Sequence, residues 1–504
     1  MVVIQNLLGM TVAANRPPGV NRQNLIPQCE RSRPVARVNR TVDIRPLRPS
    51  SAAGSCHDEH LVAVARPFVA GSSVALCREV PVTVSIVEPN RESQRLPTSS
   101  MWMRMDRFAL WFPLAVFVVT RVINGAMIGL ASNKQIAIPS TGLGGRLAIA
   151  SPASPDFWVV ATNWDGRWYG AIATYGYPDH LPVDSGGQVL PNAYAFPPLY
   201  PMLVRFLMSV TGLDFTVAGP IVSFVCGAAA MVLVFRLVAE TAGRRAGALT
   251  VMMLCTYMSA PVFQISYSES LTLLLVCSAL WLLSRRRYAS VALVLLLLAL
   301  TRPVGLAVTL VVLVHGLMRY RNRSEQAFAL RDRLWVFGVA GLGALLASLW
   351  PLCVALMTGR PNAYLDSMAA WNQDGSSRPL TGWLSQAWRQ AGALGLLALL
   401  LGVMACIWLV RRGGAQEWSV EVRAWAWAYP LFLFFATGLG TSSIRYGVLA
   451  FPMMWPFVER TSRGPDRKMQ LAFALALASV GVVAQWVWIS DFVVATARID
   501  GTFP

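Results

Sequence analysis

Long apolar runs alternate with short basic clusters from about residue 101 to the end of the chain. A perpendicular helix needs about 20 apolar residues to cross a bilayer core, so this pattern predicts an all-α polytopic membrane protein. About eleven transmembrane helices are expected, at approximately 108–130, 217–238, 246–263, 268–284, 288–300, 303–319, 335–357, 391–410, 424–441, 446–459 and 469–490. Several runs are short, and breaks such as Thr301-Arg302-Pro303 and Ser443-Ile444-Arg445 indicate helices that end at a cavity.

The run from Tyr194 to Thr211 fits a membrane crossing poorly, because it has three prolines near its start and Arg205 in its middle. We expect it to lie along the membrane surface as an interfacial helix. Every later basic cluster is then cytoplasmic, as the positive-inside rule favours: Arg244-Arg245, Arg285 to Arg287, Arg319 with Arg321 and Arg323, Arg411-Arg412, and Arg460 to Lys468. The amino end is predicted inside and the carboxyl end outside, with outer loops at 131–211 and 358–390.

The composition supports a multi-pass protein of the cell membrane. The 504 residues are 55% hydrophobic and 13% charged, whereas soluble domains carry about 25% charged residues. The formal net charge of +18 comes from clusters between apolar runs, which is typical of membrane topology, so we predict membrane lipids and no nucleic acid as partners. The eight cysteines form no CxxC pair and the four histidines form no cluster, so neither a disulfide framework nor a metal site is predicted.

Residues 1–100 have a different composition. They are rich in Arg, Pro, Ser and Val, contain no lysine and have no apolar run long enough to cross a membrane. This composition predicts a disordered basic extension ahead of a transmembrane domain at 101–504. The alternative is that translation starts at Met101, Met103 or Met105, and we assign no function to the extension.

An acidic, aromatic-rich stretch, NWDGRWYGAIATYGY at 163–177, lies in the first outer loop. Trp164, Trp168 and Ile172 recur at helical spacing, which predicts a short amphipathic helix on the membrane surface. Asp165 is then at the polar boundary and is a candidate general base; the alternative is a carboxylate that caps the helix or pairs with Arg167. Aromatic residues are typical of membrane interfaces, but three are also candidates for sugar or acceptor contacts: Trp164, Trp168 and Tyr169.

Three further charged residues are predicted at membrane depth on the outer side: Glu269, Arg302 and Arg445. Ionisable side chains there cost about 2.5–3.5 kcal/mol each on insertion scales and usually face a cavity or a partner. One interpretation is that Glu269 pairs with an arginine only to hold helices together. The other is that both arginines bind the phosphate of a lipid-linked substrate, because a planar guanidinium donates two parallel hydrogen bonds to phosphate. Asp165 would then deprotonate the acceptor hydroxyl.

Five segments occur in the order seen in the PIG-V family, the GPI mannosyltransferase II family: WDGRWYGAIATYGY, NAYAFPPLYP, FQISYSESLTLLL, LTRPVGLA and SSIRYGVLAFP. The chain resembles bacterial members of this family from about Met101 to the last span. It departs from the eukaryotic pattern in having Trp168 where a histidine is typical, and in Pro198-Leu199-Tyr200 of the second segment.

The resemblance implies a class C glycosyltransferase (GT-C) fold and an inverting sugar transfer, outside the cytoplasm, from a polyprenyl-phosphate donor. By motif match it makes Asp165 the base, and it matches Glu269 to the glutamate of YSES and Arg445 to the arginine of SIRY. The family's GPI acceptor is not expected to carry over to a bacterial-type chain. A glycolipid, a lipoglycan or a protein would each fit as the acceptor.

We therefore predict a membrane mannosyltransferase that uses polyprenyl-phosphate-mannose at an extracytoplasmic site. Asp165 is the expected base, and Arg302 and Arg445 hold the donor phosphate. Glu269, with Tyr267 and Tyr446, is expected to orient the site. No cofactor is required for such a transfer, and the sequence leaves a divalent metal open. Two alternatives are a transporter or flippase for a lipid-linked sugar and a non-catalytic subunit of an envelope-glycan assembly complex.

Overall fold

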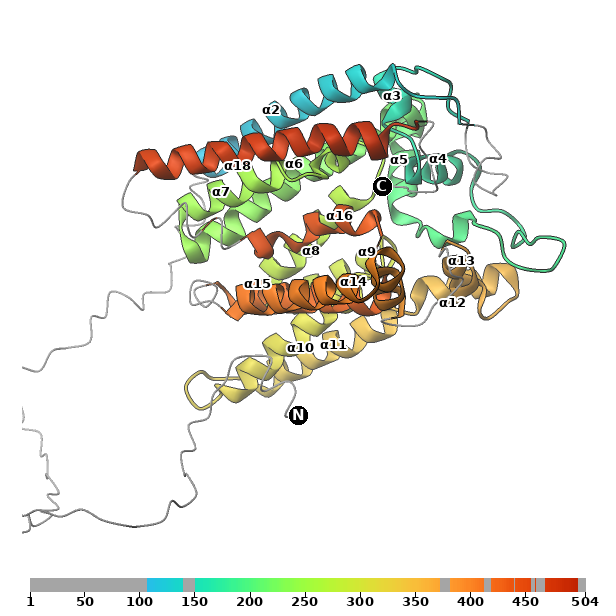
Figure 1. Ribbon diagram of the computed structural model, residues 1–504. Helices are drawn as coiled ribbons and strands as arrows, with labels where there is room; N and C mark the ends of the chain where they lie inside the picture. The colour runs from blue at the N-terminus through green and yellow to red at the C-terminus, as the bar shows by residue number, and fades with distance from the viewer. Residues whose placement is uncertain are drawn as a thin grey trace, which may run out of the picture. The chain divides into compact units, whose positions relative to one another are not determined.

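The computed structural model describes residues 107–138, 150–371, 381–411, 418–438, 440–454, 458 and 467–496. Residues 1–100, with the predicted extension, lie outside this description. The regular elements of the described residues are helices (Figure 1): α2 (Arg107–Ser132), α3 (Phe157–Val160), α4 (Asp165–Tyr175), η3 (Ala193–Ala195), α5 (Leu199–Thr211), α6 (Phe215–Ala242), α7 (Arg244–Cys255), η4 (Ala260–Phe263), α8 (Glu269–Ser284), α9 (Tyr288–Ala299), α10 (Gly305–Arg321), α11 (Leu330–Leu346), α12 (Leu349–Thr358), α13 (Ala363–Ala370), α14 (Thr381–Arg411), α15 (Val420–Ala436), α16 (Ser442–Tyr446), η6 (Gly447–Met454), α18 (Arg467–Trp488) and η7 (Ile489–Val493).

The chain is an all-α multi-pass membrane protein. Five helical stretches of the described residues are long and apolar enough to cross a membrane: Arg107–Ser132, Phe215–Ala242, Leu330–Thr358, Thr381–Arg411 and Lys468–Val493. Other predicted spans are shorter helices. α9, for example, has 12 residues and is about 18 Å long at 1.5 Å per residue. The predicted total of eleven crossings stays a prediction.

Some predicted spans are not continuous α-helices. The run at 335–357 divides into α11, which ends at Leu346, and α12, which begins at Leu349. The run at 246–263 is α-helical only as far as Cys255, where α7 ends, and resumes as the 3-10 helix η4. The run at 446–459 begins with the last residue of α16 and continues as the 3-10 helix η6. Prolines in the last two segments, Pro261 and Pro452, lack the backbone N–H that an α-helix interior needs. An apolar run therefore predicted burial correctly but not helix continuity.

Buried polar side chains satisfy the backbone where α7 breaks. Arg121 of α2 donates hydrogen bonds to the carbonyls of Ala260 and Cys255. Gln485 of α18 donates to the carbonyl oxygens of Cys255 and Tyr257, at 3.0 Å each. Inside a membrane an unwound backbone is tolerated only where protein or water satisfies its polar groups. These contacts therefore fix the segment that leads into the YSES motif.

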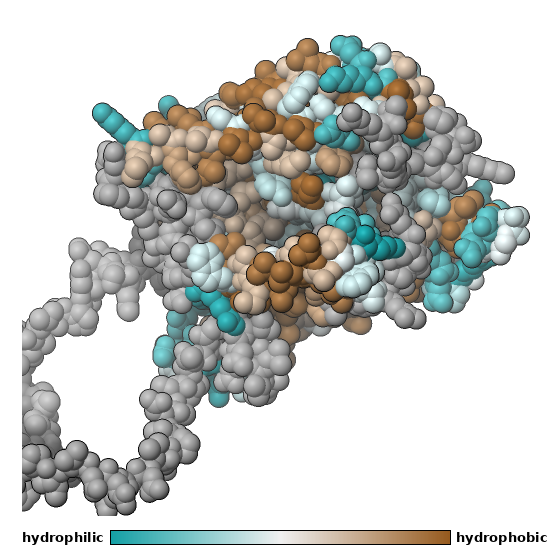
Figure 2. Space-filling view, in the orientation of Figure 1, coloured by the Kyte–Doolittle hydropathy of each residue, from teal (hydrophilic) through white to brown (hydrophobic). Residues whose placement is uncertain are grey.

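The helices pack as neighbours that are often distant in sequence. α6 packs against α2, α7 and α8, and α10 packs against α11 and α15. The shorter elements α4, α5, α12 and α13 gather at one end of the long helices (Figure 1). Hydrophobic residues lie over α14 and α18 on the face seen in Figure 2. Leu397 of α14 and Val483 of α18 are among the exposed apolar side chains. Such surfaces on helices of spanning length suit contact with lipid.

The two predicted interfacial helices differ from each other. α5 has 13 residues, too few to cross a bilayer, and exposes Phe206 and Val210. α4 is present as predicted, but the residues from Gly166 to Ala173 are all buried. The spacing of Trp164, Trp168 and Ile172 therefore belongs to a helix enclosed by the protein, and the surface placement was wrong. Helical spacing cannot distinguish side chains that face lipid from those that face protein, because both are apolar.

Candidate active site

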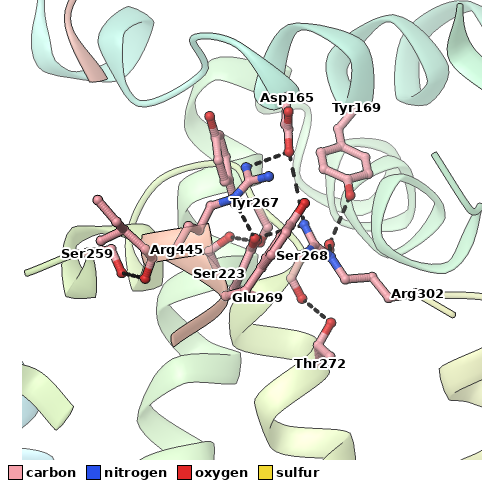
Figure 3. A network of polar contacts seen from close by, with 12 residues as sticks. Asp165, Tyr169, Ser223, Ser259, Tyr267, Ser268, Glu269, Thr272, Arg302 and Arg445 are labelled. Atoms are coloured by element: carbon pink, nitrogen blue, oxygen red, sulfur yellow. Dashed lines mark hydrogen bonds and ion pairs between the residues drawn. The ribbon is translucent and has the colours of Figure 1, made fainter. Parts of the chain in front are cut away.

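Four charged side chains from four separate segments meet in one cluster (Figure 3). Arg445 Nη1 lies 2.6 Å from Asp165 Oδ2, and Arg445 Nε lies 3.0 Å from Glu269 Oε1. Arg302 Nη2 lies 2.8 Å from the same Glu269 oxygen and 4.0 Å from Asp165 Oδ2. Each carboxylate thus lies between both guanidiniums, and the formal charge of the four groups sums to zero.

Each of these groups lies at or beside a helix end. Asp165 and Glu269 are the first residues of α4 and α8, where the helix dipole favours a negative charge. Arg445 is in the last turn of α16, where a positive charge is favoured. Arg302 lies in the break between α9 and α10, directly before Pro303. The break predicted at Thr301-Arg302-Pro303 is therefore confirmed, whereas Ser443-Ile444-Arg445, also predicted as a break, is helical within α16.

Hydrogen bonds tie these chain segments to one another. The Ser266 N–H donates to the Ala161 carbonyl at 2.7 Å, which joins the approach to α8 to the approach to α4. The Ser259 hydroxyl donates to the Ile444 carbonyl at 3.1 Å, beside Arg445. A Cβ on Gly166 would lie 3.3 Å from Ser266 Cβ, so this glycine permits the close approach of α4. The relative positions of the charged groups are therefore set by the backbone.

The turn before Asp165 is strained and well anchored. Trp164 has φ 56° and ψ −113°, a conformation that costs a non-glycine residue about 1–3 kcal/mol. Its indole N–H donates to the Val493 carbonyl at 2.9 Å. The neighbouring Asn163 side chain donates to the same carbonyl at 3.1 Å and to Gln135 Oε1 at 2.7 Å. These contacts hold the turn that directs the Asp165 carboxylate at the arginines.

Burial differs across the cluster. The side chain of Glu269 is 0% exposed and that of Arg445 is 4% exposed, whereas Arg302 and Asp165 are 15% and 20% exposed. A buried charge must be paired, because removing one partner leaves the other desolvated and uncompensated. Glu269 therefore holds the two guanidiniums from inside the protein. Asp165 meets them on the side nearer to solvent.

Tyr267 and Tyr446, predicted as orienting residues, lie against the guanidiniums. The Arg445 carbon Cζ is 4.8 Å from the ring centroid of Tyr267 and 5.4 Å from that of Tyr446. Arg302 Cζ is 5.5 Å from the Tyr446 centroid. All three distances are within the range of cation–π attraction.

Sequence reasoning missed Ser268, which links Arg302 to α4. The Arg302 Nε–H donates to Ser268 Oγ at 2.8 Å, and the same hydroxyl shares a hydrogen bond of 2.9 Å with Tyr169. Burial raises the pKa of the Tyr169 hydroxyl to about 12, so it stays protonated at physiological pH. The available signal was the position of Ser268 inside the YSES motif, directly before Glu269.

Replacing Ser268 by alanine is expected to raise the donor KM about tenfold with a smaller effect on kcat. The change leaves Arg302 Nε and the Tyr169 hydroxyl without this partner, and an unmade buried hydrogen bond costs about 1–3 kcal/mol. Ser268→Thr keeps the hydroxyl and should restore the KM. Ser270→Ala is the matched control, because Ser270 is fully buried two residues away and its hydroxyl has no hydrogen-bond partner among the described residues. Equal KM changes in the two alanine variants would contradict this positioning role.

The three aromatic candidates for substrate contact are buried against protein groups. Trp164 bonds to Val493 as described above, and Tyr169 reaches Ser268. Trp168 is 1% exposed, stacks on Phe196 at 6.0 Å and meets Trp371 edge-on at 5.4 Å. Their contact with a sugar stays a prediction. Trp371 directly precedes residues 372–380 of the second predicted outer loop, which lie outside the described residues.

A mostly apolar pocket lies beside the charged cluster. It is small, with a cavity volume of about 30 Å³, and lies between residues of α9, α10, α11 and α12. Arg302 forms part of its wall, and the other lining residues include Leu295, Ala299, Leu306, Leu346 and Pro351. The arrangement thus combines cationic groups with a hydrocarbon-lined cavity.

We looked among the described residues for groups that could bind a metal ion and for paired cysteines. There, no three His, Cys, Asp or Glu side chains gather closely enough to hold a metal ion, and we assign no metal ligands. Five cysteines fall in the described residues, and all are free thiols: Cys226, Cys255, Cys277, Cys353 and Cys406.

Comparison with known proteins does not assign the chain to a family. No family model matches the chain and no curated protein matches it, so the resemblance to the PIG-V family stays a prediction. The solved structures that align with it include the archaeal oligosaccharyltransferase AglB from Archaeoglobus fulgidus in complex with an inhibitory peptide and a dolichol-phosphate. That alignment has 13% identity and a TM-score of 0.42, and it covers 79% of this chain and 57% of that chain.

The apo form of the Archaeoglobus fulgidus oligosaccharyltransferase aligns with 13% identity and a TM-score of 0.42, covering 75% of this chain and 56% of that one. The chain therefore spans little more than half the length of these structures. At such TM-scores the alignments carry no argument about activity.

Proposed function

We propose that this protein is a membrane glycosyltransferase that moves a sugar from a polyprenyl-phosphate carrier to an acceptor hydroxyl. The observation that carries the proposal is the meeting of two guanidiniums, one partly exposed carboxylate and an apolar pocket in one place. A polyprenyl-phosphate sugar has the complementary parts: a phosphate, a reactive sugar carbon and a hydrocarbon chain.

The two arginines are suited to the phosphate of such a donor. Charge-assisted hydrogen bonds from guanidinium to phosphate are short, strong and bidentate. The pocket wall that includes Arg302 continues into apolar residues, and each CH₂ group buried there adds about 0.8 kcal/mol of binding free energy. An amphipathic anion thus satisfies both halves of the site, whereas a soluble sugar nucleotide would leave the apolar pocket without a matching group.

The proposed reaction is a single displacement at the sugar carbon C1. Asp165 accepts the proton of the acceptor hydroxyl, and the acceptor oxygen forms a bond to C1. The bond between C1 and the phosphate oxygen breaks, and the polyprenyl phosphate leaves with the electron pair. Arg302 and Arg445 stabilise the negative charge that develops on the leaving phosphate. Because attack and departure occur on opposite sides of C1, the configuration inverts.

We further propose that the sugar is mannose and that the donor is polyprenyl-phosphate-mannose. The site is on the extracytoplasmic side of the cell membrane. These proposals are supported by the resemblance of the five segments and by the basic clusters between the apolar runs. The acceptor is a glycolipid, lipoglycan or protein outside the cytoplasm.

The direct test supplies radiolabelled polyprenyl-phosphate-mannose and native lipid extract to membranes that contain the full chain. Transfer of label to a new product, absent from membranes without the protein, would support the function, and the product identifies the acceptor. A protein that binds the donor through Arg302 and Arg445 but transfers no label would favour a transporter of lipid-linked sugars instead.

Filling the pocket is expected to impair use of the donor. Ala299 of α9 is part of its wall, so Ala299→Phe should raise the KM for a long-chain donor about tenfold or more, since several CH₂ contacts are lost. Leu293→Phe is the control, because Leu293 lies on the same helix and is 58% exposed. The comparison is made by initial transfer rates over a range of donor concentrations. A normal KM in Ala299→Phe would remove the pocket from the donor site.

A further inference from the structure

Two nitrogens of each guanidinium contact side chains of the cluster. Arg302 uses Nε for Ser268 and Nη2 for Glu269. Arg445 uses Nε for Glu269 and Nη1 for Asp165. The rings of Tyr267 and Tyr446 lie within 5.5 Å of the guanidinium carbons. A phosphate oxygen that contacts both arginines at once therefore competes with Asp165 Oδ2, which lies near both of them.

The two carboxylates differ in how readily a phosphate can displace them from the guanidiniums. Glu269 is fully buried at the start of α8, whereas the Asp165 side chain is 20% exposed. Asp165 Oδ2 is 2.6 Å from Arg445 and 4.0 Å from Arg302, so one carboxylate oxygen lies where one phosphate oxygen would contact both guanidiniums. An anionic ligand and this side chain cannot both hold that position, because like charges at contact distance repel strongly in a poorly solvated site.

We propose that Asp165 is the resident anion of the two-arginine site and that the donor phosphate displaces it. This inference rests on the proposed function and adds a regulatory step to it. While Asp165 pairs with Arg445, the carboxylate oxygen that makes this contact is engaged and is not available to accept a proton. Binding of the donor phosphate turns the arginines to the phosphate and releases that oxygen toward the acceptor. The donor must then bind before the acceptor can react, and the base becomes available only when there is a sugar to transfer.

The proposal makes an unusual prediction about binding: removing the catalytic carboxylate should tighten the phosphate ligand. Farnesyl phosphate, a short prenyl phosphate, is titrated into the detergent-purified full chain, and farnesol serves as its uncharged counterpart. Asp165→Asn is expected to bind farnesyl phosphate about tenfold more tightly than wild type, the size expected from one competing charge-assisted contact. Farnesol binding is expected to be unchanged.

Three further variants separate this effect from others. Asp156→Asn makes the same change of charge nine residues away and preserves the cap that Asp156 provides to α3, so its affinity should equal that of wild type. Asp165→Glu keeps a competing carboxylate and should remain within about twofold of wild type. Asp165→Ala repeats the removal of the carboxylate if the asparagine variant does not fold, as judged by thermal melting.

Unchanged or weaker binding of farnesyl phosphate in the carboxylate-free variant would overturn the proposal. Equal tightening in Asp156→Asn would also overturn it, because the cause would then be overall charge. The outcome is independent of the transfer assay. If Asp165→Asn binds farnesyl phosphate more tightly but wild type transfers no sugar, the displacement of Asp165 stands and the glycosyltransferase function is rejected. If wild type transfers sugar but Asp165→Asn binds no more tightly, the function stands and the displacement is rejected.

Discussion

Replacing Asp165 by asparagine is expected to reduce sugar transfer by about 10²–10⁴-fold, the usual contribution of a general base. Asparagine has nearly the same shape as aspartate but cannot take up the acceptor proton. The reaction would then have to expel a proton to water in a site where the Asp165 side chain is 20% exposed. The measurement is the initial rate of label transfer from polyprenyl-phosphate-mannose, with equal amounts of protein in the membrane.

Asp156→Asn is the control for this experiment, because Asp156 belongs to the same loop and its side chain caps α3 through the Val159 N–H. Its transfer rate should match wild type. An Asp165→Asn protein that transfers sugar at more than about a tenth of the wild-type rate would reject Asp165 as the base. Combined with the binding experiment above, the expected pattern is tighter donor binding together with lost transfer. A variant that merely unfolds cannot produce that pattern.

Replacing Arg445 by alanine is expected to have the second large effect, on both donor use and stability. Arg445 is 4% exposed and contacts Asp165 and Glu269 directly. Its loss leaves the fully buried Glu269 with Arg302 as its remaining partner in this cluster, and breaking a buried pair in this way costs about 3–5 kcal/mol. We expect the apparent melting temperature in detergent to fall and donor turnover to become undetectable.

Arg445→Lys separates charge from geometry. Lysine restores a positive charge opposite Glu269 but not the planar fork that binds phosphate, so stability should recover more than the donor KM does. Arg205→Lys, on the exposed side of α5, controls for the exchange of arginine for lysine. Full recovery of the KM in Arg445→Lys would show that the site needs only a point charge, against the proposed bidentate contact.

The apolar pattern of the sequence predicted the helices closely. The run at 108–130 corresponds to α2, Arg107–Ser132, and the run at 288–300 corresponds to α9, Tyr288–Ala299. The reason is physical: a long apolar segment in a bilayer must satisfy its own backbone, and the α-helix does so within the segment. Some runs divide: 246–263 and 446–459 consist of α-helical and 3-10 pieces, and 335–357 consists of α11 and α12.

The sequence also singled out Asp165, Glu269, Arg302 and Arg445. A charged side chain in an apolar segment is costly in free energy, so each one can be identified from the sequence as a residue with a partner or a function. Both the ion-pair and the substrate interpretations followed from it. Glu269 pairs with both arginines in the structure, and both interpretations include such a pair. The substrate interpretation is the proposal for which the experiments above are designed.

Only the tertiary structure decided how these groups are arranged. Asp165 meets Arg445 across 280 residues of sequence, and Ser268 joins Arg302 to Tyr169 through one hydroxyl. Neither contact leaves a periodic signal, because each depends on where helix ends from separate segments meet. The burial of α4 was hidden for a related reason: lipid and protein interior select the same apolar side chains. The sequence by itself determined the helices and the residues that carry charge, and the packing of helix ends determined which of those charges face each other.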